Sequence, residues 1–236
     1  MSEFITFSSA VDTYIESFCK LKEKVIEDIR YANEYVQITF NKEVGGRKHG
    51  IMVKTPYLIK ENNNLQIFEQ PHWIFCFSPK TLITPEWYKK CEQYGYELKF
   101  HDILMSLAPI PRYSPNQHVY KVKQTETANV INSFYQREVI DFDNEKIVSS
   151  YFYKQENPIC YGKGMLVNKM VCIHQVFTHP HYRKRGIAKE VCKTLLQEMN
   201  SVDTIGSVLV ATEMAVPLYK SLGFKKIGDV HIFDKG

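Results

Sequence analysis

The chain has 236 residues, which is enough for one large domain or two small ones. Its hydrophobic fraction of 44% and charged fraction of 24% are those of an ordinary soluble globular protein. The formal net charge of +4 can help to hold an anion, but it is too small to indicate nucleic-acid binding by itself.

The first half of the chain has the pattern of one long helix followed by short strands. Apolar residues at helical spacing predict a helix over residues 8–30, capped by Ser8 or Ser9. The run Thr84-Pro85-Glu86 has the N-cap, proline and acid of a second helix start, and this helix is expected to end at Gly95, before a strand to Leu107. Strands are predicted at residues 36–40, 51–53, 65–68 and 73–77, with turns at Gly45-Gly46 and Asn62-Asn63-Asn64.

A proline-rich stretch at residues 108–116 is the best linker candidate in the chain. We therefore expect one domain over residues 1–115 and another over residues 116–236. In the second domain, helices are predicted over residues 125–137, 187–199 and 213–222, and the last should stop at Gly223. Strands are predicted at residues 147–153, 159–167, 170–177 and 208–211, then to Phe233, with a tight hairpin at Asn168-Lys169.

The two halves end alike. In each, a buried strand leads to a helix that carries a Tyr-Lys pair, and a glycine and another strand follow, with Gly95 in the first half and Gly223 in the second. This echo indicates an internal duplication, although ordinary C-capping by glycine produces a similar pattern.

The cysteines and the apolar runs exclude several other classes. The six cysteines form no CxxC pair, so the sequence supports neither a zinc site nor a thioredoxin-like motif. The N-terminus has no secretory signal, and the apolar runs are far shorter than the ~20 residues that span a bilayer. We expect a cytoplasmic protein with reduced core cysteines and without a metal, nucleic-acid or membrane partner.

The most informative segment covers residues 173–188. A strand is broken by Pro180, and the basic run His181-Tyr182-Arg183-Lys184-Arg185 leads through Gly186 into an amphipathic helix. Free backbone N–H groups and the positive end of the helix dipole point outward at such a junction, and a glycine lets a phosphate approach the backbone. The segment matches neither a Walker A loop nor a dinucleotide loop, and its spacing alone also suits a solvated basic turn before a surface helix.

Two motifs in this half resemble signatures of the GNAT acetyltransferase superfamily. Val176-Phe177-Thr178-His179-Pro180 followed by Arg183-x-x-Gly186-x-Ala188 resembles its acyl-CoA signature, a V-x-V-x-P strand end before Q/R-x-x-G-x-G/A. Further on, the run from Ala215 to Phe224 resembles A-x-x-L-Y-x-x-x-G-F. Thr212 departs from the Asn that the family often has there, and the basic loop has one glycine fewer. The resemblance covers roughly residues 117–236 and implies an α/β (α+β) fold with a mixed, mostly antiparallel sheet flanked by helices.

The N-terminal half resembles a degenerate second copy, as in tandem GNAT proteins, and we expect it to have a scaffold or substrate-lining role. Its run from Gly45 to Gly50 is not followed by a helical pattern, so a hairpin turn is expected there rather than a phosphate loop.

The resemblance also implies a cosubstrate, acetyl-CoA, and a site for it. Tyr219 is the expected general acid for the departing thiolate, and His174 is a candidate base for the amine, although a histidine satisfied within the sheet and a water chain are alternatives. Glu213 is read as a first-turn acid favoured by the helix dipole. The expected acetyl-CoA contacts are Val176, Phe177, Thr178, Arg183, Lys184, Arg185, Gly186, Ile187, Ala188, Lys189, Thr212 and Tyr219.

The implied function is N-acetylation of a primary amine by direct transfer. The acceptor is expected to be a small molecule, with an amino acid, an antibiotic and a protein N-terminus as alternatives, and the protein is expected to be a monomer or a homodimer. A non-catalytic acyl-CoA-binding regulator on the same fold is the main competing hypothesis. A nucleic-acid or ribosome-associated protein that uses the basic loop is a weaker one.

Overall fold

The computed structural model describes residues 5–56, 70–79, 85–144 and 148–236, and these residues form two compact units. The N-terminal unit contains Thr6–Met105, Val210–Val216 and Lys226–Gly236. The C-terminal unit contains Ile5, Ser106–Leu209 and Pro217–Lys225. Each unit is therefore assembled from several stretches of chain, and the last strand belongs with the first half of the sequence.

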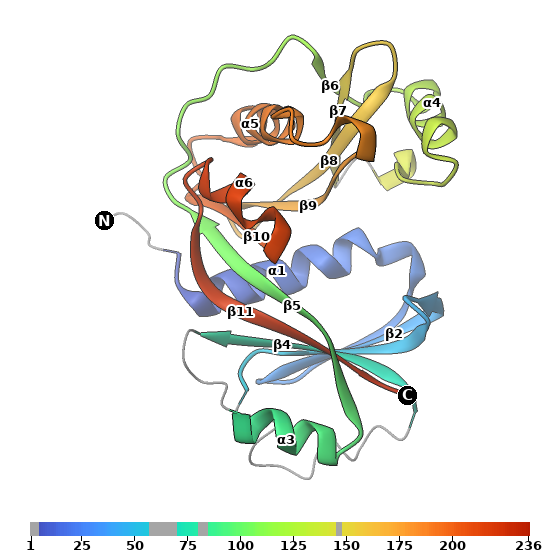
Figure 1. Ribbon diagram of the computed structural model, residues 1–236, viewed down its shortest axis with the longest axis vertical. Coiled ribbons are helices and arrows are strands. Elements are labelled where there is room, and N and C mark those ends of the chain that lie inside the picture. The colour runs from blue at the N-terminus through green and yellow to red at the C-terminus, as the bar shows by residue number, and fades with distance from the viewer. Residues whose placement is uncertain (1–4, 57–69, 80–84, 145–147) are drawn as a thin grey trace. The chain divides into compact units, whose positions relative to one another are not determined.

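A mixed sheet forms the centre of the N-terminal unit, with a helix on each face (Figure 1). Its strands lie in the order β1-β2-β3-β4-β11-β5, and β3 and β4 are parallel whereas β1–β2, β2–β3 and β4–β11 are antiparallel. Helix α1 covers one face through ring contacts of Phe18 with Phe75, and α3 covers the other through Trp87. The elements are α1 Phe7–Leu21, β1 Ile26–Tyr31, β2 Tyr35–Val44, β3 Arg47–Val53, β4 His72–Pro79, α3 Pro85–Gln93, β5 Tyr96–Leu107 and β11 Lys225–Lys235.

The first helix is shorter than the sequence predicts. It begins after Thr6, which forms a reciprocal capping box with Ser9, and it ends at Leu21. Residues 22–30 of the expected helix instead form a 3₁₀ turn, Glu23–Val25, and most of strand β1. The apolar residues of this stretch fit either period, and pairing of β1 with β2 decides between them. The hairpin at Gly45-Gly46 is confirmed, whereas the strand expected at residues 65–68 lies outside the described residues.

The C-terminal unit also contains a row of strands, with helices on both sides (Figure 1). Its strands lie in the order β10-β9-β8-β7-β6; β9 and β10 are parallel and the other pairs are antiparallel. The turn between β8 and β9 has positive φ angles of 48° at Asn168 and 59° at Lys169, which confirms the predicted tight hairpin. The elements are β6 Val119–Lys121, α4 Thr125–Tyr135, β7 Ser149–Lys154, β8 Pro158–Val167, β9 Met170–Thr178, α5 Ile187–Met199, β10 Gly206–Thr212 and α6 Val216–Lys220.

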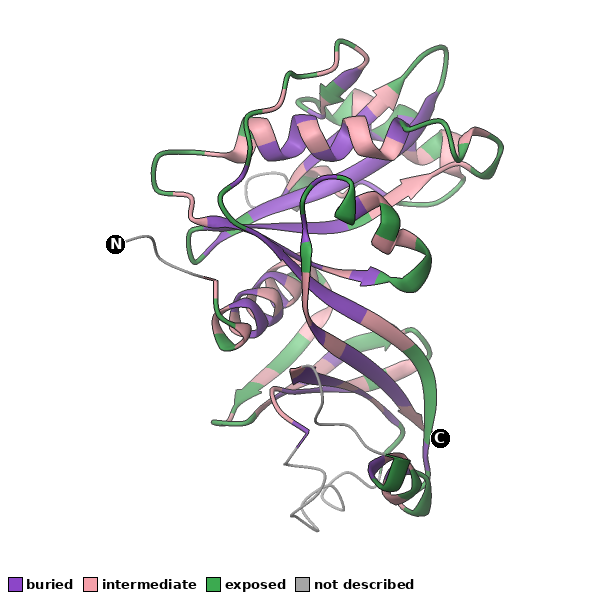
Figure 2. Cartoon of the chain, turned by 60° about the vertical axis from the view of Figure 1, so that its left-hand side comes forward, coloured by how far each residue is buried: buried purple, intermediate pink, exposed green. Residues whose placement is uncertain are grey.

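Helix α5 lies unusually close to β8 because two glycines face it. A Cβ atom at Gly164 would lie 2.4 Å from Sδ of Met199 and 2.9 Å from Cδ2 of Leu195. One at Gly162 would lie 3.1 Å from Cγ1 of Val191. Buried residues line the sheet-facing side of α5 and the adjoining strands (Figure 2). The close packing of α5 on β8 therefore depends on the absence of side chains at these two strand positions.

The predicted linker and the predicted last helix both differ from expectation in detail. Residues 108–116 have no helix or strand, but they are anchored along α5: the backbone N–H of Tyr113 donates to Oε1 of Gln197 at 2.8 Å and that of Asn116 to Oγ1 of Thr194 at 3.2 Å. The expected helix over residues 213–222 is a 3₁₀ turn, Glu213–Ala215, followed by the short α6. The chain then turns at Gly223, which has a φ of 93°.

Candidate functional site

Strand β9 carries a bulge at Gln175. On β8 the paired residues Tyr161 and Lys163 are two positions apart, whereas their partners Phe177 and His174 are three positions apart, so β9 contains one extra residue. Gln175 is exposed and has a φ of 49°, in the left-handed region. A bulge of this kind bends the strand and changes the direction of the side chains that follow it.

The pairing of β9 with β10 stops just before this bulge. The parallel ladder joins Met170 to Gly206 and ends at the pair of Cys172 and Val208, whereas β9 itself continues to Thr178. The predicted contact residues Val176, Phe177 and Thr178 lie on this continuation and are half-buried. Because an extended ligand can hydrogen-bond to a strand edge that no neighbouring strand occupies, this stretch of β9 can take an extended chain.

The loop after β9 turns into the first turn of α5. A 3₁₀ turn at Pro180–Tyr182 follows the strand, and Lys184 and Gly186 have positive φ angles of 61° and 76°. Gly186 is the N-cap of α5 and provides no capping side chain, and a Cβ there would meet nothing within 4 Å. The N–H groups of Ile187, Ala188 and Lys189 stand at the helix start, where they have no intrahelical acceptor. This geometry is that of an anion site with space over the glycine.

The three cations of the loop are exposed and held by the loop itself. Nε of Arg183 donates to the carbonyl oxygen of Thr178 at 3.1 Å, and its guanidinium lies 5.7 Å from the ring centroid of Phe177. An Nη atom of Arg185 donates to the carbonyl oxygen of His181 at 3.2 Å.

Within the described part of the chain, no carboxylate forms an ion pair with Arg183, Lys184 or Arg185, so their charge is available to an anion.

Tyr219 lies on α6 and is 6% exposed. Its ring packs edge-on against Phe224 at 5.8 Å. Burial raises its pKa well above the usual value, and the thiols of Cys192 and Cys160 raise it further. The phenol therefore keeps its proton throughout the neutral pH range.

His174 is 7% exposed and lies on β9 directly before the bulge, opposite Lys163. It is on the sheet face opposite α5, because the neighbouring Gly162 and Gly164 of β8 face that helix. It also has an interaction with another group, so it does not point freely into solvent.

The structure brings most of the predicted site residues together in one unit. Val176 to Lys189 and Tyr219 all belong to the C-terminal unit, whereas Thr212 belongs to the N-terminal unit. Thr212 stands at the N-cap of the turn that contains Glu213, but its side chain makes no capping hydrogen bond. Sequence reasoning missed the bulge at Gln175, for which the sequence has no recognisable signal, and the pair Gly162 and Gly164, whose spacing within an apolar strand was a usable signal.

Two further features of the described residues concern the sequence predictions. They contain no group of three or more His, Cys, Asp or Glu side chains arranged to hold a metal ion. None of the helices seen in residues 5–56, 70–79, 85–144 and 148–236 is both long and apolar enough to cross a bilayer.

A known family shares sequence with the second half of the chain. Residues 111–236, more than half of the chain, match the family model described as the acetyltransferase (GNAT) domain. A curated protein of Stachybotrys chartarum named "Acetyltransferase" is 31% identical over 71 residues, which are 30% of this chain and only 30% of that protein.

Solved structures resemble the whole chain. A GCN5-related N-acetyltransferase from Kribbella flavida has a TM-score of 0.63 at 11% identity and covers 96% of this chain and 95% of its own. An acetyltransferase from the GNAT family of Colwellia psychrerythraea has a TM-score of 0.52 at 12% identity, over 97% and 94% of the two chains. At sequence identities of 11% and 12%, the structural similarity shows a shared fold, whereas the match to the family model shows family membership. The chain belongs to the GNAT acetyltransferase family.

Proposed function

We propose that the protein is an N-acetyltransferase that moves the acetyl group of acetyl-CoA directly to a primary amine of a small molecule. The observation that carries this proposal is the continuation of β9 from the bulge at Gln175 to Thr178. It has no partner in the β10 ladder and leads directly into the anion site at the start of α5. An extended chain that ends in a phosphate fits both features together.

The residues of the C-terminal unit fit this donor. Acetyl-CoA supplies the acetyl group as an activated thioester. The N–H groups from Lys184 to Lys189, with the side chains of Arg183, Lys184 and Arg185, would hold its pyrophosphate over the open space at Gly186. The backbone from Val176 to Thr178 would pair with the pantetheine arm, and an N–H near Val176 would polarise the thioester carbonyl.

Transfer forms a C–N bond and breaks a C–S bond, so one proton must leave the amine and one must reach the sulfur. We assign His174 as the proton acceptor and Tyr219 as the donor. A phenol of raised pKa is a weaker acid than a free thiol, whose pKa is about 8.5. However, the burial that raises the pKa of Tyr219 would also raise the pKa of a thiol beside it. The pKa of the phenol is therefore closer to that of a buried thiol than to that of a free one.

Donor binding is tested by thermal unfolding with and without acetyl-CoA. At one hundred times its dissociation constant, acetyl-CoA should stabilise the native protein by about 2.7 kcal/mol. Gly186→Glu and Gly186→Gln place side chains of the same shape at a backbone of φ 76°, so both suffer the same strain. Only the glutamate repels a phosphate, so the shift should be smallest in Gly186→Glu. Equal shifts in all three proteins would remove this loop from the donor site.

Turnover is tested with Tyr219→Phe, which preserves the ring contact with Phe224. We expect turnover of an acceptor amine to fall by about 10²–10⁴-fold while the acetyl-CoA thermal shift is unchanged. If His174 is the base, the pH–rate profile of His174→Ala should lack the acidic limb that the wild type has. A wild type that binds acetyl-CoA but acetylates no amine in a broad screen would favour the regulator hypothesis.

We also propose that the N-terminal half is a degenerate GNAT-like copy and that the protein is cytoplasmic. The two halves share a strand, a helix and a left-handed glycine, with φ angles of 81° at Gly95 and 93° at Gly223. The backbone N–H of Gly95 donates to Glu92 and that of Gly223 to Lys220, three residues back in each case. All six cysteines are buried and free, which suits a reducing compartment.

A further inference from the structure

The N-terminal unit contains an apolar pocket that the proposed transfer reaction does not use. Its volume is 290 Å³, and it lies on the α1 face of the sheet, beside the C-terminal end of α1. Because α1 ends at Leu21, it leaves part of this face uncovered. A water molecule occupies about 30 Å³ in the liquid, so the pocket has space for about ten non-hydrogen atoms.

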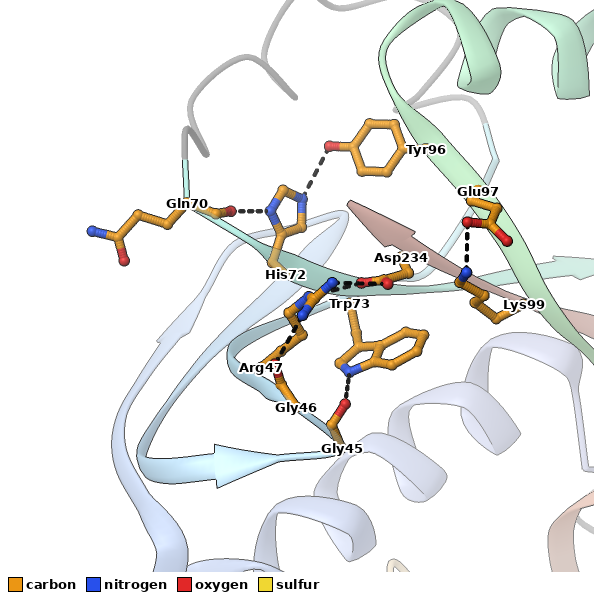
Figure 3. Close-up of polar contacts among 10 residues, drawn as sticks. All are labelled: Gly45, Gly46, Arg47, Gln70, His72, Trp73, Tyr96, Glu97, Lys99 and Asp234. Carbon is orange, nitrogen blue, oxygen red and sulfur yellow. Dashed lines mark hydrogen bonds and ion pairs between the residues drawn. The ribbon is translucent and has the colours of Figure 1, made fainter. Parts of the chain in front are cut away.

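Aromatic side chains form much of the wall, and one of them is fixed in place. Phe40, Trp73 and Phe75 line the pocket, and Phe100, 58% exposed, stands at its rim. Nε1 of Trp73 donates to the carbonyl oxygen of Gly45 at 3.1 Å (Figure 3). A Cβ atom at Gly45, where φ is 61°, would lie 3.3 Å from that nitrogen. The β2–β3 turn therefore holds the indole in one orientation.

The turn is itself anchored next to the pocket. Arg47 forms a two-pronged ion pair with Asp234, with Nε–Oδ1 at 2.8 Å and Nη2–Oδ2 at 2.9 Å (Figure 3). The aromatic wall is thus positioned before any ligand binds, which reduces the entropy lost on binding.

A glycine inside strand β3 leaves the space that the pocket occupies. Gly50 pairs with Ile38 of β2 and is buried, in a position where β-branched residues are usual. Its φ lies outside the left-handed region, and a Cβ there would meet Phe40 at an ordinary 3.6 Å. Neither backbone strain nor close packing therefore requires glycine at this position. A strand glycine of this kind is typical of a site that a ligand approaches.

The polar end of the pocket is cationic. Lys22, the C-cap residue of α1, is the charged residue of the lining, and it has no ion-pair or side-chain hydrogen-bond partner among the residues that the structure describes. Burial lowers the pKa of its amine, and Lys42 nearby lowers it further. A carboxylate bound beside Lys22 would offset both effects, because an opposite charge favours the charged amine.

We propose that this pocket binds a small apolar carboxylate, a straight-chain or arylalkyl acid of about ten non-hydrogen atoms, with its carboxylate at Lys22 and its apolar part against Trp73. Octanoate, which has ten non-hydrogen atoms, is the probe.

Intrinsic fluorescence reports directly on the pocket. The protein has two tryptophans; Trp73 lines the pocket, and Trp87, on α3, is buried against the other face of the sheet. Titration of the full chain with octanoate should give a saturable change in fluorescence. Trp73→Phe should lose that change, because the remaining tryptophan, Trp87, lies on the other face of the sheet. Octan-1-ol, with the same chain and no charge, should bind the wild type about tenfold more weakly.

Two variants separate the apolar and the charged parts. Gly50→Val fills the space with a residue that suits a strand, and it should reduce octanoate affinity at least tenfold in a protein with an unchanged circular dichroism spectrum. Lys22→Gln should weaken octanoate about tenfold and octan-1-ol not at all, and Lys22→Arg should restore octanoate binding. The proposal is overturned if octanoate gives no saturable change at millimolar concentration, or if Gly50→Val binds it as well as the wild type. It is also overturned if Phe100→Ser converts a wild-type dimer to a monomer, because a second chain would then cover the pocket.

Discussion

His231 should make the N-terminal unit sensitive to acid. Its side chain is 4% exposed, and Nδ1 is buried without a hydrogen-bond partner among the described residues. The ring stacks on His101 of β5 at 4.7 Å and meets Trp87 and Tyr88 of α3 edge-on. Burial lowers the pKa of His231 to about 4; His101 and Lys226 lower it as well, whereas Asp229 opposes them.

The direction of the effect follows from the two protonation equilibria. The unfolded chain binds a proton at this histidine below about pH 6.5, whereas the folded protein does not until about pH 4. The stability that His231 provides is therefore fully present above pH 6.5 and is lost as the pH falls toward 4. The difference between a pKa of 6.5 in the unfolded chain and about 4 in the folded protein corresponds to about 3 kcal/mol of stability in the limit and to about 2 kcal/mol at pH 5.

The assay compares urea unfolding of the wild type and His231→Phe at pH 7.5 and pH 5.0. Phenylalanine keeps the aromatic contacts and cannot be protonated. Between pH 7.5 and pH 5.0 the variant should therefore lose about 2 kcal/mol less stability than the wild type. Groups that titrate in both proteins cancel in this difference. His181→Phe, at an exposed loop histidine, is the control and should behave as the wild type. Equal pH dependence in the wild type and His231→Phe would refute the reasoning.

Further predictions concern packing and the turn. Gly164→Ala should lower the free energy of unfolding by about 1–3 kcal/mol because the added methyl group meets Met199, and Gly162→Ala should cost less; denaturant titration of the pair tests this. A double-mutant cycle with Arg47→Met and Asp234→Asn should give a coupling of about 1–3 kcal/mol, more than for an exposed pair, because both side chains are largely buried. A coupling near zero would mean that the turn is held by other contacts.

The loop that leads into α5 could be predicted from sequence because its pattern is local. A proline after a strand, a basic run and a glycine before an amphipathic stretch are consecutive in the chain, and the structure has the loop and α5 where they were expected. The bulge at Gln175 depends instead on the register of β9 against β8. Glutamine has no special preference for a φ of 49°, so nothing in the local sequence indicates it.

Long-range pairing explains the other differences. Residues 225–235 have the alternation of apolar and polar residues that a strand should have. This alternation does not indicate which strand they pair with, and their partner β4 lies about 150 residues earlier in the chain. Likewise, residues 22–30 have apolar positions that suit either a helix or a strand, and β2 selects the strand.

The strand glycines show why a site is harder to predict than a fold. A Cβ at Gly228 would lie 2.5 Å from Cε2 of Phe7 and 2.7 Å from the carbonyl oxygen of Ser78, so this glycine allows close packing, as Gly164 does under α5. Gly50 has only an ordinary contact at 3.6 Å and leaves a space that a ligand can fill. All three look alike in sequence, because each glycine stands between one polar or charged residue and one apolar residue. Their opposite consequences depend on where the facing helix lies: α5 runs over Gly164, whereas α1 ends at Leu21, beside the space at Gly50. The end of α1 is the boundary that the sequence misplaced, so an error of nine residues in the length of one helix also hid the pocket.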